Sequence, residues 1–325
     1  MTHPVEVEIP HARPLSTPPQ DAIAAVLETT GDVTLAFIIA VKGPSYRPVG
    51  AAMALFPDGS RIGSLSSGCV EGDLAAHAQR ILTGAPEVIR YGEGSPYFDI
   101  QLPCGGGMEV LLVRSPDRAA LQEVHRRRGR REACVLRIDL QSGAMEVGAA
   151  DPAARASLGV DGAQFSVLFE PEIRFVIFGK GPEATSFAKL VASVGFPNLL
   201  LSPDLETLDA VAAMGCSVQH LTHAAFPHTL AVDERTAITL FFHDHDWEPP
   251  VLKGALGTRA FYIGAQGSQR ARDARALALS NLGVSQAAIA RIHGPIGLIP
   301  SARDATTLAV SVLAEVLATA MPPKG

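Results

Sequence analysis

The sequence predicts an α/β protein with two domains, a small N-terminal α/β domain followed by a domain built on a parallel sheet. The chain has 325 residues, which is more than one ordinary hydrophobic core accommodates. Apolar residues make up 47% of it, so there is enough material to fill two cores. The C-terminal half also alternates apolar, strand-like runs with segments of helical period, as a parallel sheet requires. We expect a loose arm over residues 1–19, an N-terminal domain over 20–170 and a C-terminal domain over 171–325.

A strand, a glycine turn and a helix follow one another at residues 175–184. An apolar run predicts a buried strand, and behind the turn apolar residues recur at helical spacing. Between them, Gly179, Gly181 and Ala184 have the spacing typical of dinucleotide-binding turns. There the first glycine permits the tight turn, the second lets a pyrophosphate approach backbone N–H groups, and the small third residue lets helix and strand pack closely. The pattern predicts a Rossmann-like C-terminal domain and leaves open whether it binds a nucleotide.

Composition narrows the classes of partner. The net charge of −6 and the lack of a long basic face argue against nucleic acid. No apolar run approaches bilayer length and no signal pattern opens the chain, so we expect a cytoplasmic protein without a membrane partner. The four cysteines form no CxxC pair, which argues against a disulfide scaffold or a zinc knuckle. The basic run at 126–131 is typical of a solvated helix end, with a patch for a partner protein or phosphate as the alternative.

A loop rich in small and hydroxyl residues leads directly into a helix expected over 70–82. Its backbone N–H groups, together with the hydroxyls of Ser64, Ser66 and Ser67, would suit an anion. Cys69 would lie at the helix N-terminus, where the helix dipole favours the thiolate. The alternative is a tight turn and a helix cap beside a small buried cysteine.

Three glycines follow Cys104, before a strand expected over 108–113. A run of glycines lets a bulky group approach the backbone and leaves the sulfur uncovered, whereas glycines weaken a core strand. Cys104 is therefore the first candidate for a reactive or ligand-binding thiol. Cys134 and Cys216 have apolar sequence neighbours, and we expect them to fill the core.

The remaining N-terminal segments are expected to form one sheet with helices beside it. Further strands are predicted over 33–41 and 51–56, and a helix over 117–130. Two later segments, 133–138 and 144–147, are expected to return as strands to the same sheet.

Two segments of the C-terminal domain follow predicted strands at the edge where open α/β sheets bind ligands. The His-Asp-His-Asp segment 243–246 permits a metal site or, because adjacent side chains of an extended segment point to opposite faces, a hydrogen-bonded loop. Residues 264–268 form a second strand-to-helix turn suited to phosphate. A turn is expected over 293–298 and a closing helix over 305–318.

Taken together, these segments resemble the XdhC/CoxI family, the xanthine dehydrogenase accessory proteins. In the N-terminal half the matching pieces are 43–47 with 50–51, 63–71 and 103–106. In the C-terminal half they are 178–181, 243–246, 262–268, 295–298 and the run before 314–315. No single piece is specific, but the ordered set extends over roughly residues 33–318.

The resemblance implies an accessory role for a molybdenum enzyme. Family members are similar in binding molybdenum cofactor (molybdopterin), protecting it, assisting its sulfuration and handing it to a molybdenum hydroxylase apoenzyme. The implied partners are therefore the apoenzyme, a cofactor sulfurase and, since members often assemble as dimers, a second copy of the chain. The implied fold, a small α/β domain followed by a Rossmann-like domain, agrees with the fold predicted above.

The expected site consists of two thiols and the loops around them. Cys69 and Cys104 are the candidate molybdenum ligands, because thiolate is a soft ligand. The cofactor-binding residues expected beside them are Arg47, Ser64, Ser66, Ser67, Gly68, Glu71, Gly105, Gly106, Gly107, Gly179, Gly181, Ala184, His243, Gly264 and Ser268.

Two other functions stay open. One is an NAD(P)-dependent oxidoreductase that uses the turn at 179–184, with a thiol or His243 as the acid–base group. Against nicotinamide binding, Ser202 stands where dinucleotide sites carry an acidic residue, and Pro182 lacks an N–H that would face the phosphate. The other is a protein adaptor without a small ligand.

Overall fold

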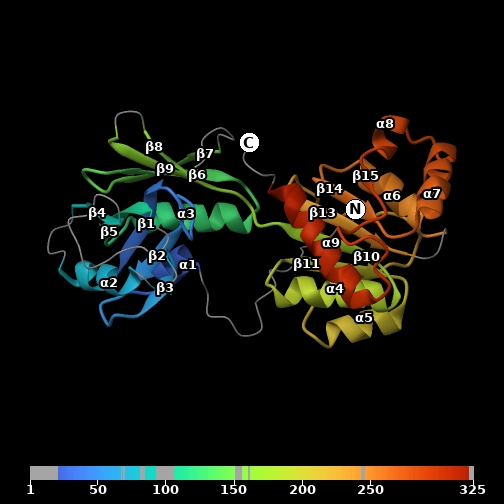
Figure 1. The fold of residues 1–325 in the computed structure, drawn as a ribbon, viewed down its shortest axis with the longest axis horizontal. Coiled ribbons are helices and arrows are strands. Elements are labelled where there is room, and N and C mark those ends of the chain that lie inside the picture. Colours follow the sequence, from blue (N-terminus) through green and yellow to red (C-terminus); the bar gives the residue numbers. More distant parts are fainter. Residues whose placement is uncertain are drawn as a thin grey trace, which may run out of the picture. The chain divides into compact units, whose positions relative to one another are not determined.

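The computed structural model describes residues 21–66, 68, 70–80, 85–92, 106–150, 156–159, 162–242 and 246–321. The chain divides into two compact units (Figure 1). The N-terminal unit comprises residues 16–171, and the C-terminal unit is made mainly of residues 172–325. Each unit has hydrophobic cores of its own, and the chain is an α/β protein as predicted.

An antiparallel sheet forms the centre of the N-terminal unit, with the strand order β3-β2-β1-β5-β4 among the described residues. The strands are β1 (Thr34–Lys42), β2 (Ala52–Leu55), β3 (Arg61–Gly63), β4 (Glu87–Gly92) and β5 (Gly107–Arg114). Side chains of β1 alternate between two cores, because successive residues of a strand point to opposite faces. Leu35 and Phe37 pack with helices α1 (Ala22–Glu28) and α3 (Arg118–Gly129), whereas Ala36 and Ile38 pack with α2 (Glu71–Arg80).

A second antiparallel sheet corrects one prediction. Its strands are β6 (Cys134–Asp139), β7 (Met145–Ala149), β8 (Ser157–Leu158) and β9 (Gln164–Phe169), in the order β7-β6-β9-β8. The expectation that residues 133–138 and 144–147 return to the first sheet is wrong. The place beside β5 is taken by β4, which the sequence analysis did not predict. The second sheet instead packs its apolar face, including Leu136 and Phe165, into the core that contains Leu35 and Phe37.

The C-terminal unit has a parallel sheet with the order β12-β11-β10-β13-β14-β15 in its described part. The strands are β10 (Arg174–Gly179), β11 (Asn198–Ser202), β12 (Val218–His220), β13 (Thr236–Phe241), β14 (Tyr262–Ala265) and β15 (Ile292–His293). The chain proceeds outward from β10 to β12 and then restarts at β13 on the other side. This reversal is the position at which open α/β sheets bind ligands, outside the carboxyl ends of the strands.

Helices cover both faces of the parallel sheet, as in a Rossmann-like domain (Figure 1). One face packs against α4 (Gly181–Ser193), α5 (Leu205–Ala212) and α9 (Ala305–Ala320), and the other against α6 (Glu248–Leu256), α7 (Gln269–Asn281) and α8 (Gln286–Ile289). The turn expected from His293 begins one residue later, because His293 still pairs with β14 as the end of β15. No helix in the described ranges combines the length and the apolarity needed to cross a bilayer.

Candidate functional site

The loop before α2 is organised around the carboxylate of Glu71, which is only 3% exposed. The backbone N–H of Ser66 donates to Oε1 at 2.7 Å, and the Ser66 hydroxyl donates to Oε2. Leu65 N–H donates to Oε1 at 3.2 Å, and Val70 N–H lies 3.3 Å from Oε2. The Ser64 hydroxyl lies 3.2 Å from Oε1 and 2.5 Å from the carbonyl oxygen of Ser66. Of the donors that the sequence analysis offered to an external anion, those of Ser64 and Ser66 thus contact a carboxylate of the same chain.

Glu71 is held as an anion. Its burial acts to raise the pKa, but the hydrogen bonds from Ser66 and Ser64 outweigh burial and lower the pKa below its ordinary value. The structure therefore brings together Ser64, Ser66 and Glu71 of the predicted site. Gly68 is exposed beside them, and Ser67 and Cys69 lie outside the described residues.

A second loop cluster lies where β1 ends and β5 begins, since Lys42 pairs with Gly107. A Cβ atom on Gly106 would lie 2.5 Å from the carbonyl oxygen of Pro44 and 2.7 Å from that of Lys42. Only glycine permits this approach. The sequence analysis expected a bulky group to approach these glycines, and at Gly106 that group is the backbone of the same chain. The exposed Arg47 belongs to the same loop, and its carbonyl accepts from Ser45 Oγ at 2.8 Å.

Two of the sequence segments that resemble the XdhC/CoxI family therefore meet at this end of the sheet, 43–47 through Pro44 and 103–106 through its last residue, Gly106. Cys104 and Gly105 precede Gly106 in the chain and lie outside the described residues.

A cavity of about 410 Å³ opens at the same strand ends. Its lining comprises Ala40, Val41, Lys42, Arg90, Gly107, Met108 and Glu109. Arg90 and Glu109 face each other across β4 and β5, and Arg90 Nε donates to Glu109 Oε1 at 2.9 Å. Of the lining residues, only Gly107 is among the predicted site residues. Strand β4 was not predicted, and an ion pair between residues of two strands leaves no motif in the local sequence.

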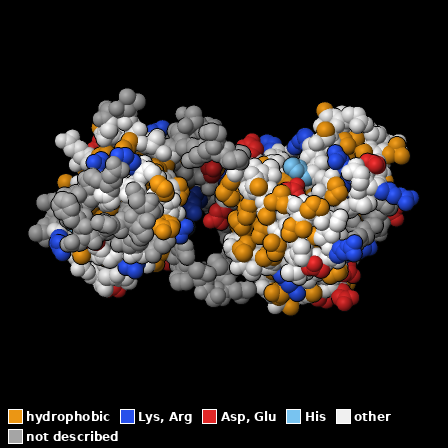
Figure 2. Space-filling model, viewed as in Figure 1, with side chains coloured by type: hydrophobic (Ala, Val, Ile, Leu, Met, Phe, Trp, Pro, Cys, Tyr) orange, Lys and Arg blue, Asp and Glu red, His pale blue; other side chains and the backbone are white. Residues whose placement is uncertain are grey.

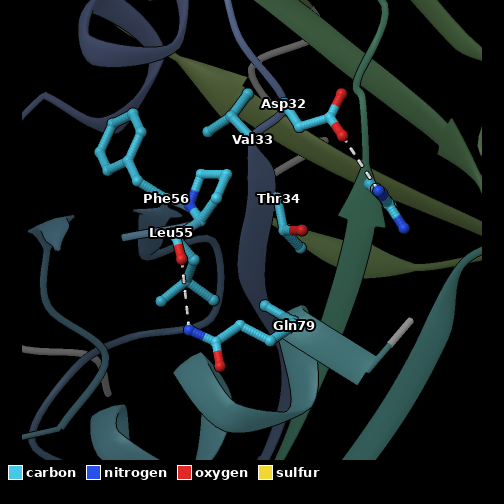
Figure 3. A pocket seen from close by; sticks show the side chains of 9 residues that line it. Asp32, Val33, Thr34, Leu55, Phe56 and Gln79 are labelled. Atoms are coloured by element: carbon cyan, nitrogen blue, oxygen red, sulfur yellow. Dashed lines mark hydrogen bonds and ion pairs between the residues drawn. The ribbon is translucent and has the colours of Figure 1, made fainter. Parts of the chain in front are cut away.

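Another cavity, of about 270 Å³, lies at the opposite end of the sheet (Figure 3). There Thr34 pairs with Arg114, whose guanidinium forms an ion pair with Asp32 at 3.0 Å. Gln79 Nε2 donates to the carbonyl of Pro57 at 3.4 Å, so its polar side chain is engaged within the unit. None of the predicted site residues lines this cavity, and we assign it no function.

The glycine turn of the C-terminal unit has the backbone that its sequence predicts. A Cβ on Gly179 would lie 2.7 Å from the carbonyl oxygen of Phe241, and Gly181 has a φ of +81°. Ala184 is fully buried against the sheet. The N–H of Gly181, however, donates to Thr207 Oγ1 at 2.9 Å.

The same turn offers few donors to a pyrophosphate. Pro182 has no N–H, and the N–H of Gly181 is already satisfied within the fold. Asp204 caps α5 by accepting from Thr207 N–H at 2.9 Å, and hydrogen bonds from Thr207 lower its pKa. The acid that would bind a ribose is thereby used for capping, while the buried Ser202 ends β11.

At the carboxyl ends of β13 and β14, polar groups form hydrogen bonds and ion pairs with other residues of the same unit. Ser268 caps α7 by accepting from Ala271 N–H at 3.2 Å. The ring of Tyr262 covers Gly264, since a Cβ there would lie 2.6 Å from the ring. Buried Arg275 forms an ion pair with buried Glu248 at 2.6 Å and donates to the carbonyl of Gln266 at 2.6 Å.

His243 lies outside the described residues. The segment that contains it is flanked by Phe242 and Trp247, whose rings stack with centroids 6.3 Å apart. Within the described ranges, no group of three or more His, Cys, Asp and Glu residues could hold a metal ion.

A cluster around Glu315 was missed by the sequence analysis. Its Oε1 accepts from Tyr262 Oη at 3.0 Å and lies 3.3 Å from His293 Nδ1, while Oε2 accepts from the N–H of Gly297. Burial acts to raise the pKa of Glu315, but hydrogen bonds from His293, Gly297 and Tyr262 lower it below its ordinary value. The carboxylate therefore ties the loop after β15 to helix α9.

The other predictions concern packing. Cys134 is fully buried and Cys216 is half-buried, and desolvation raises the pKa of both thiols. In the basic run, Arg126 and Arg127 pair with Glu123, at 2.7 and 2.6 Å, and Arg128 pairs with Asp21 at 2.5 Å. These arginines are thus engaged within the N-terminal unit.

Comparison with known proteins identifies the family. The profile of the XdhC and CoxI family matches residues 26–92, and the profile of the XdhC Rossmann domain matches residues 175–316. The chain is 36% identical over 296 residues to the molybdenum cofactor insertion chaperone PaoD of Escherichia coli, covering 91% of this chain and 85% of PaoD. The chain belongs to the XdhC and CoxI family.

Two further relatives are more distant. A probable xanthine dehydrogenase subunit of Bacillus subtilis is 24% identical over 325 residues, with 91% of this chain and 95% of that protein covered. A crystal structure of a protein described as a xanthine dehydrogenase from Bacillus halodurans has a TM-score of 0.75 at 22% identity. The superposition covers 93% of this chain and 95% of the Bacillus halodurans protein, which shows that the two proteins share a fold.

Proposed function

We propose that this protein binds molybdenum cofactor as cargo and delivers it, after sulfuration, to a xanthine dehydrogenase-type molybdenum hydroxylase. Membership of the XdhC and CoxI family and the similarity to PaoD support an accessory role connected with this cofactor. The partners of the proposal are the hydroxylase apoenzyme and a cofactor sulfurase, and the site of action is the cytoplasm.

The observation that carries the proposal is the approach of Gly106 to Pro44 at the end of β1 and β5. It brings Gly106, the last residue of one segment of the family resemblance, against Pro44 of another, beside a cavity of about 410 Å³. That volume lies within the range of small-molecule sites, roughly 300–1,000 Å³. Cys104 stands two positions before Gly106 in the sequence, so its thiolate is our first choice of sulfur ligand, with Cys69 as the second.

The test is retention of cofactor by the purified full-length chain. Molybdenum cofactor released anaerobically from a molybdenum enzyme is added, unbound cofactor is removed by gel filtration, and the retained pterin is quantified after oxidation. We expect retention close to one equivalent, and transfer that activates a cofactor-free molybdenum hydroxylase. Cys104→Ser should lower retention about ten-fold or more, by loss of a metal–thiolate contact.

The other cysteines supply matched controls. Cys216→Ser alters a thiol in the core of the C-terminal unit and should leave retention unchanged. A wild-type chain that retains no molybdopterin with its thiols reduced would overturn the proposal. Equal retention by Cys104→Ser and Cys216→Ser would remove Cys104 from the site.

We also propose that the chain acts as a homodimer through an apolar surface of the C-terminal unit. Leu298, Ile299, Val310 and Met321 are 47–61% exposed, and Figure 2 shows hydrophobic side chains gathered over α9. The one charged side chain of α9, that of Glu315, accepts a hydrogen bond from Tyr262 and lies beside His293, so it interacts within the unit. An uncharged surface can face its own copy across a two-fold axis without repulsion. Sedimentation should give a dimer, and Val310→Asp should give a monomer; a monomeric wild type would contradict this.

A further inference from the structure

Helix α9 binds three consecutive N–H groups of the loop that follows β15. The N–H of Gly297 donates to Glu315 Oε2. The N–H of Leu298 donates to the carbonyl oxygen of Ser311 at 3.3 Å, and the N–H of Ile299 donates to Ser311 Oγ at 2.7 Å. Ser311 is only 1% exposed and the Glu315 side chain 15%, so both residues hold the loop from beneath. The backbone donors of residues 297–299 are therefore satisfied within the unit.

The contact at Gly297 shows how closely this loop lies on the helix. Gly297 has a φ of +104°, which residues with a side chain rarely adopt. A Cβ at this position would also lie 2.6 Å from Ser311 Oγ. Any other residue here would push the loop away from α9 and lengthen the hydrogen bonds between them.

The Glu315 carboxylate is in turn held from the sheet. Tyr262 Oη donates to Oε1 at 3.0 Å, and a Cβ on Gly264 would lie 2.6 Å from Tyr262 Oη. Gly264 thus leaves room for the hydroxyl group that binds Glu315. Three segments of the family resemblance, 262–268, 295–298 and the run that ends at 314–315, therefore meet at one carboxylate.

The side chains of the held loop face outward. Leu298 is 58% exposed and Ile299 is 47% exposed, and Val310, which precedes Ser311 in α9, is 51% exposed. Figure 2 shows hydrophobic side chains gathered over the same helix. Because the N–H groups of the loop are bound beneath it, a second subunit can cover these side chains without leaving those donors unpaired.

We infer that Ser311 and Glu315 are positioning residues of the homodimer contact. They hold Leu298 and Ile299 against α9, so that loop and helix meet a second copy of the chain as one apolar surface. This inference rests on the proposed homodimer. It assigns to subunit association three family segments of the C-terminal unit, and it gives Gly264 a packing role in place of a contact with cofactor.

The experiment measures the dimer dissociation constant of the full-length chain by sedimentation equilibrium. Ser311→Ala removes the acceptor of the Ile299 N–H without altering the surface, and it should raise the constant about five- to ten-fold. The matched control is Ser285→Ala. Ser285 Oγ likewise accepts a backbone N–H, that of Ala288 at 3.2 Å, but it does so on the other face of the sheet. The control should change the constant less than two-fold.

A second variant tests the same contact from the sheet. Tyr262→Phe keeps the ring and removes a donor to Glu315, and it should raise the constant about two- to five-fold. Circular dichroism and thermal unfolding establish that each variant is folded. Amide hydrogen exchange at residues 297–299 should be faster in Ser311→Ala than in the wild type, because the loop is then held less firmly.

A double-mutant cycle separates positioning from a general loss of stability. In the background Leu298→Ala/Ile299→Ala, the further change Ser311→Ala should have little effect on dimerisation, because both act through the same loop. Fully additive effects would overturn the inference. If the wild type is a dimer and neither Ser311→Ala nor Tyr262→Phe weakens it, this inference is wrong and the homodimer stands. If the wild type is a monomer, the homodimer fails and this inference fails with it.

Discussion

Ser66 donates to both oxygens of Glu71, through its N–H to Oε1 at 2.7 Å and through its hydroxyl to Oε2. The loop that precedes α2 is therefore closed by a carboxylate from the helix it leads into. A carboxylate at the first turn of a helix is also favoured by the helix dipole. We regard Glu71 as the residue that holds residues 64–66 in place before α2.

Replacing Glu71 by glutamine should destabilise the N-terminal unit. The variant loses the charge and one acceptor, and leaves buried donors of Ser66 and Val70 without a full set of partners. We expect a loss of about 2–3 kcal/mol in the free energy of unfolding, measured by urea denaturation followed by circular dichroism. Glu87→Gln, at an exposed position of β4, is the control and should change little. Equal stability of the two variants would contradict the assigned role.

The contribution of Glu71 should depend on pH with a defined sign. Because the folded pKa is below the ordinary value of 4.5, the stabilisation is complete above that value and is lost as the pH falls through the lower folded pKa. The difference in unfolding free energy between the wild type and Glu71→Gln should be constant from about pH 6 to 8 and shrink in acid. A difference independent of pH down to strongly acid conditions would show that the carboxylate charge is irrelevant.

The contact between Gly106 and Pro44 gives a third prediction. Gly106→Ala places a Cβ 2.5 Å from a backbone oxygen, so the loop must shift, and we expect a loss of about 1–3 kcal/mol in stability. Gly72→Ala meets nothing within 4 Å inside α2 and should instead stabilise the protein by about 0.5–1 kcal/mol. Thermal unfolding compares the two, and Gly106→Ala should also retain less cofactor. A neutral Gly106→Ala would show that the loops do not pack as described.

The buried pair of Arg275 and Glu248 should be strongly coupled. Arg275→Met leaves the Glu248 carboxylate buried without its partner, which typically costs about 3–5 kcal/mol. Replacing Glu248 by leucine in the same chain should recover part of the loss. The exposed pair of Arg259 and Glu234 is the control, and Arg259→Met should have little effect. If both single variants unfold at the same urea concentration, the buried pair contributes no more than the exposed one.

Nicotinamide cofactors should bind poorly. The N–H of Gly181 is satisfied by Thr207, Pro182 lacks an N–H, and Asp204 caps a helix, so a dinucleotide finds few of its usual contacts. Calorimetric titration with NADH and NADPH should show no saturable binding at micromolar concentrations. Tight stoichiometric binding of either would restore the oxidoreductase alternative.

Much of the fold followed from local pattern, because periodicity alone determines elements such as β10 with α4, or α9. The sequence did not reveal the second sheet. Because β4 occupies the edge beside β5, β6 pairs with β9 in a separate sheet, and local sequence does not show which strand takes that edge. The sequence analysis placed Ser64 and Ser66 in a loop suited to an external anion, whereas in the structure both contact the carboxylate of Glu71. A loop of donors has the same composition whether its acceptor is internal or external. The ion pair of Arg90 and Glu109 was missed because strand pairing creates it.

The stacking of Trp247 on Phe242 has a practical consequence, because Trp247 is the one tryptophan in the sequence. The intrinsic emission of the protein under selective excitation therefore originates from a single place, next to the His-Asp-His-Asp segment. A change in that emission when a ligand is added would therefore report a change in the surroundings of Trp247, within the C-terminal unit.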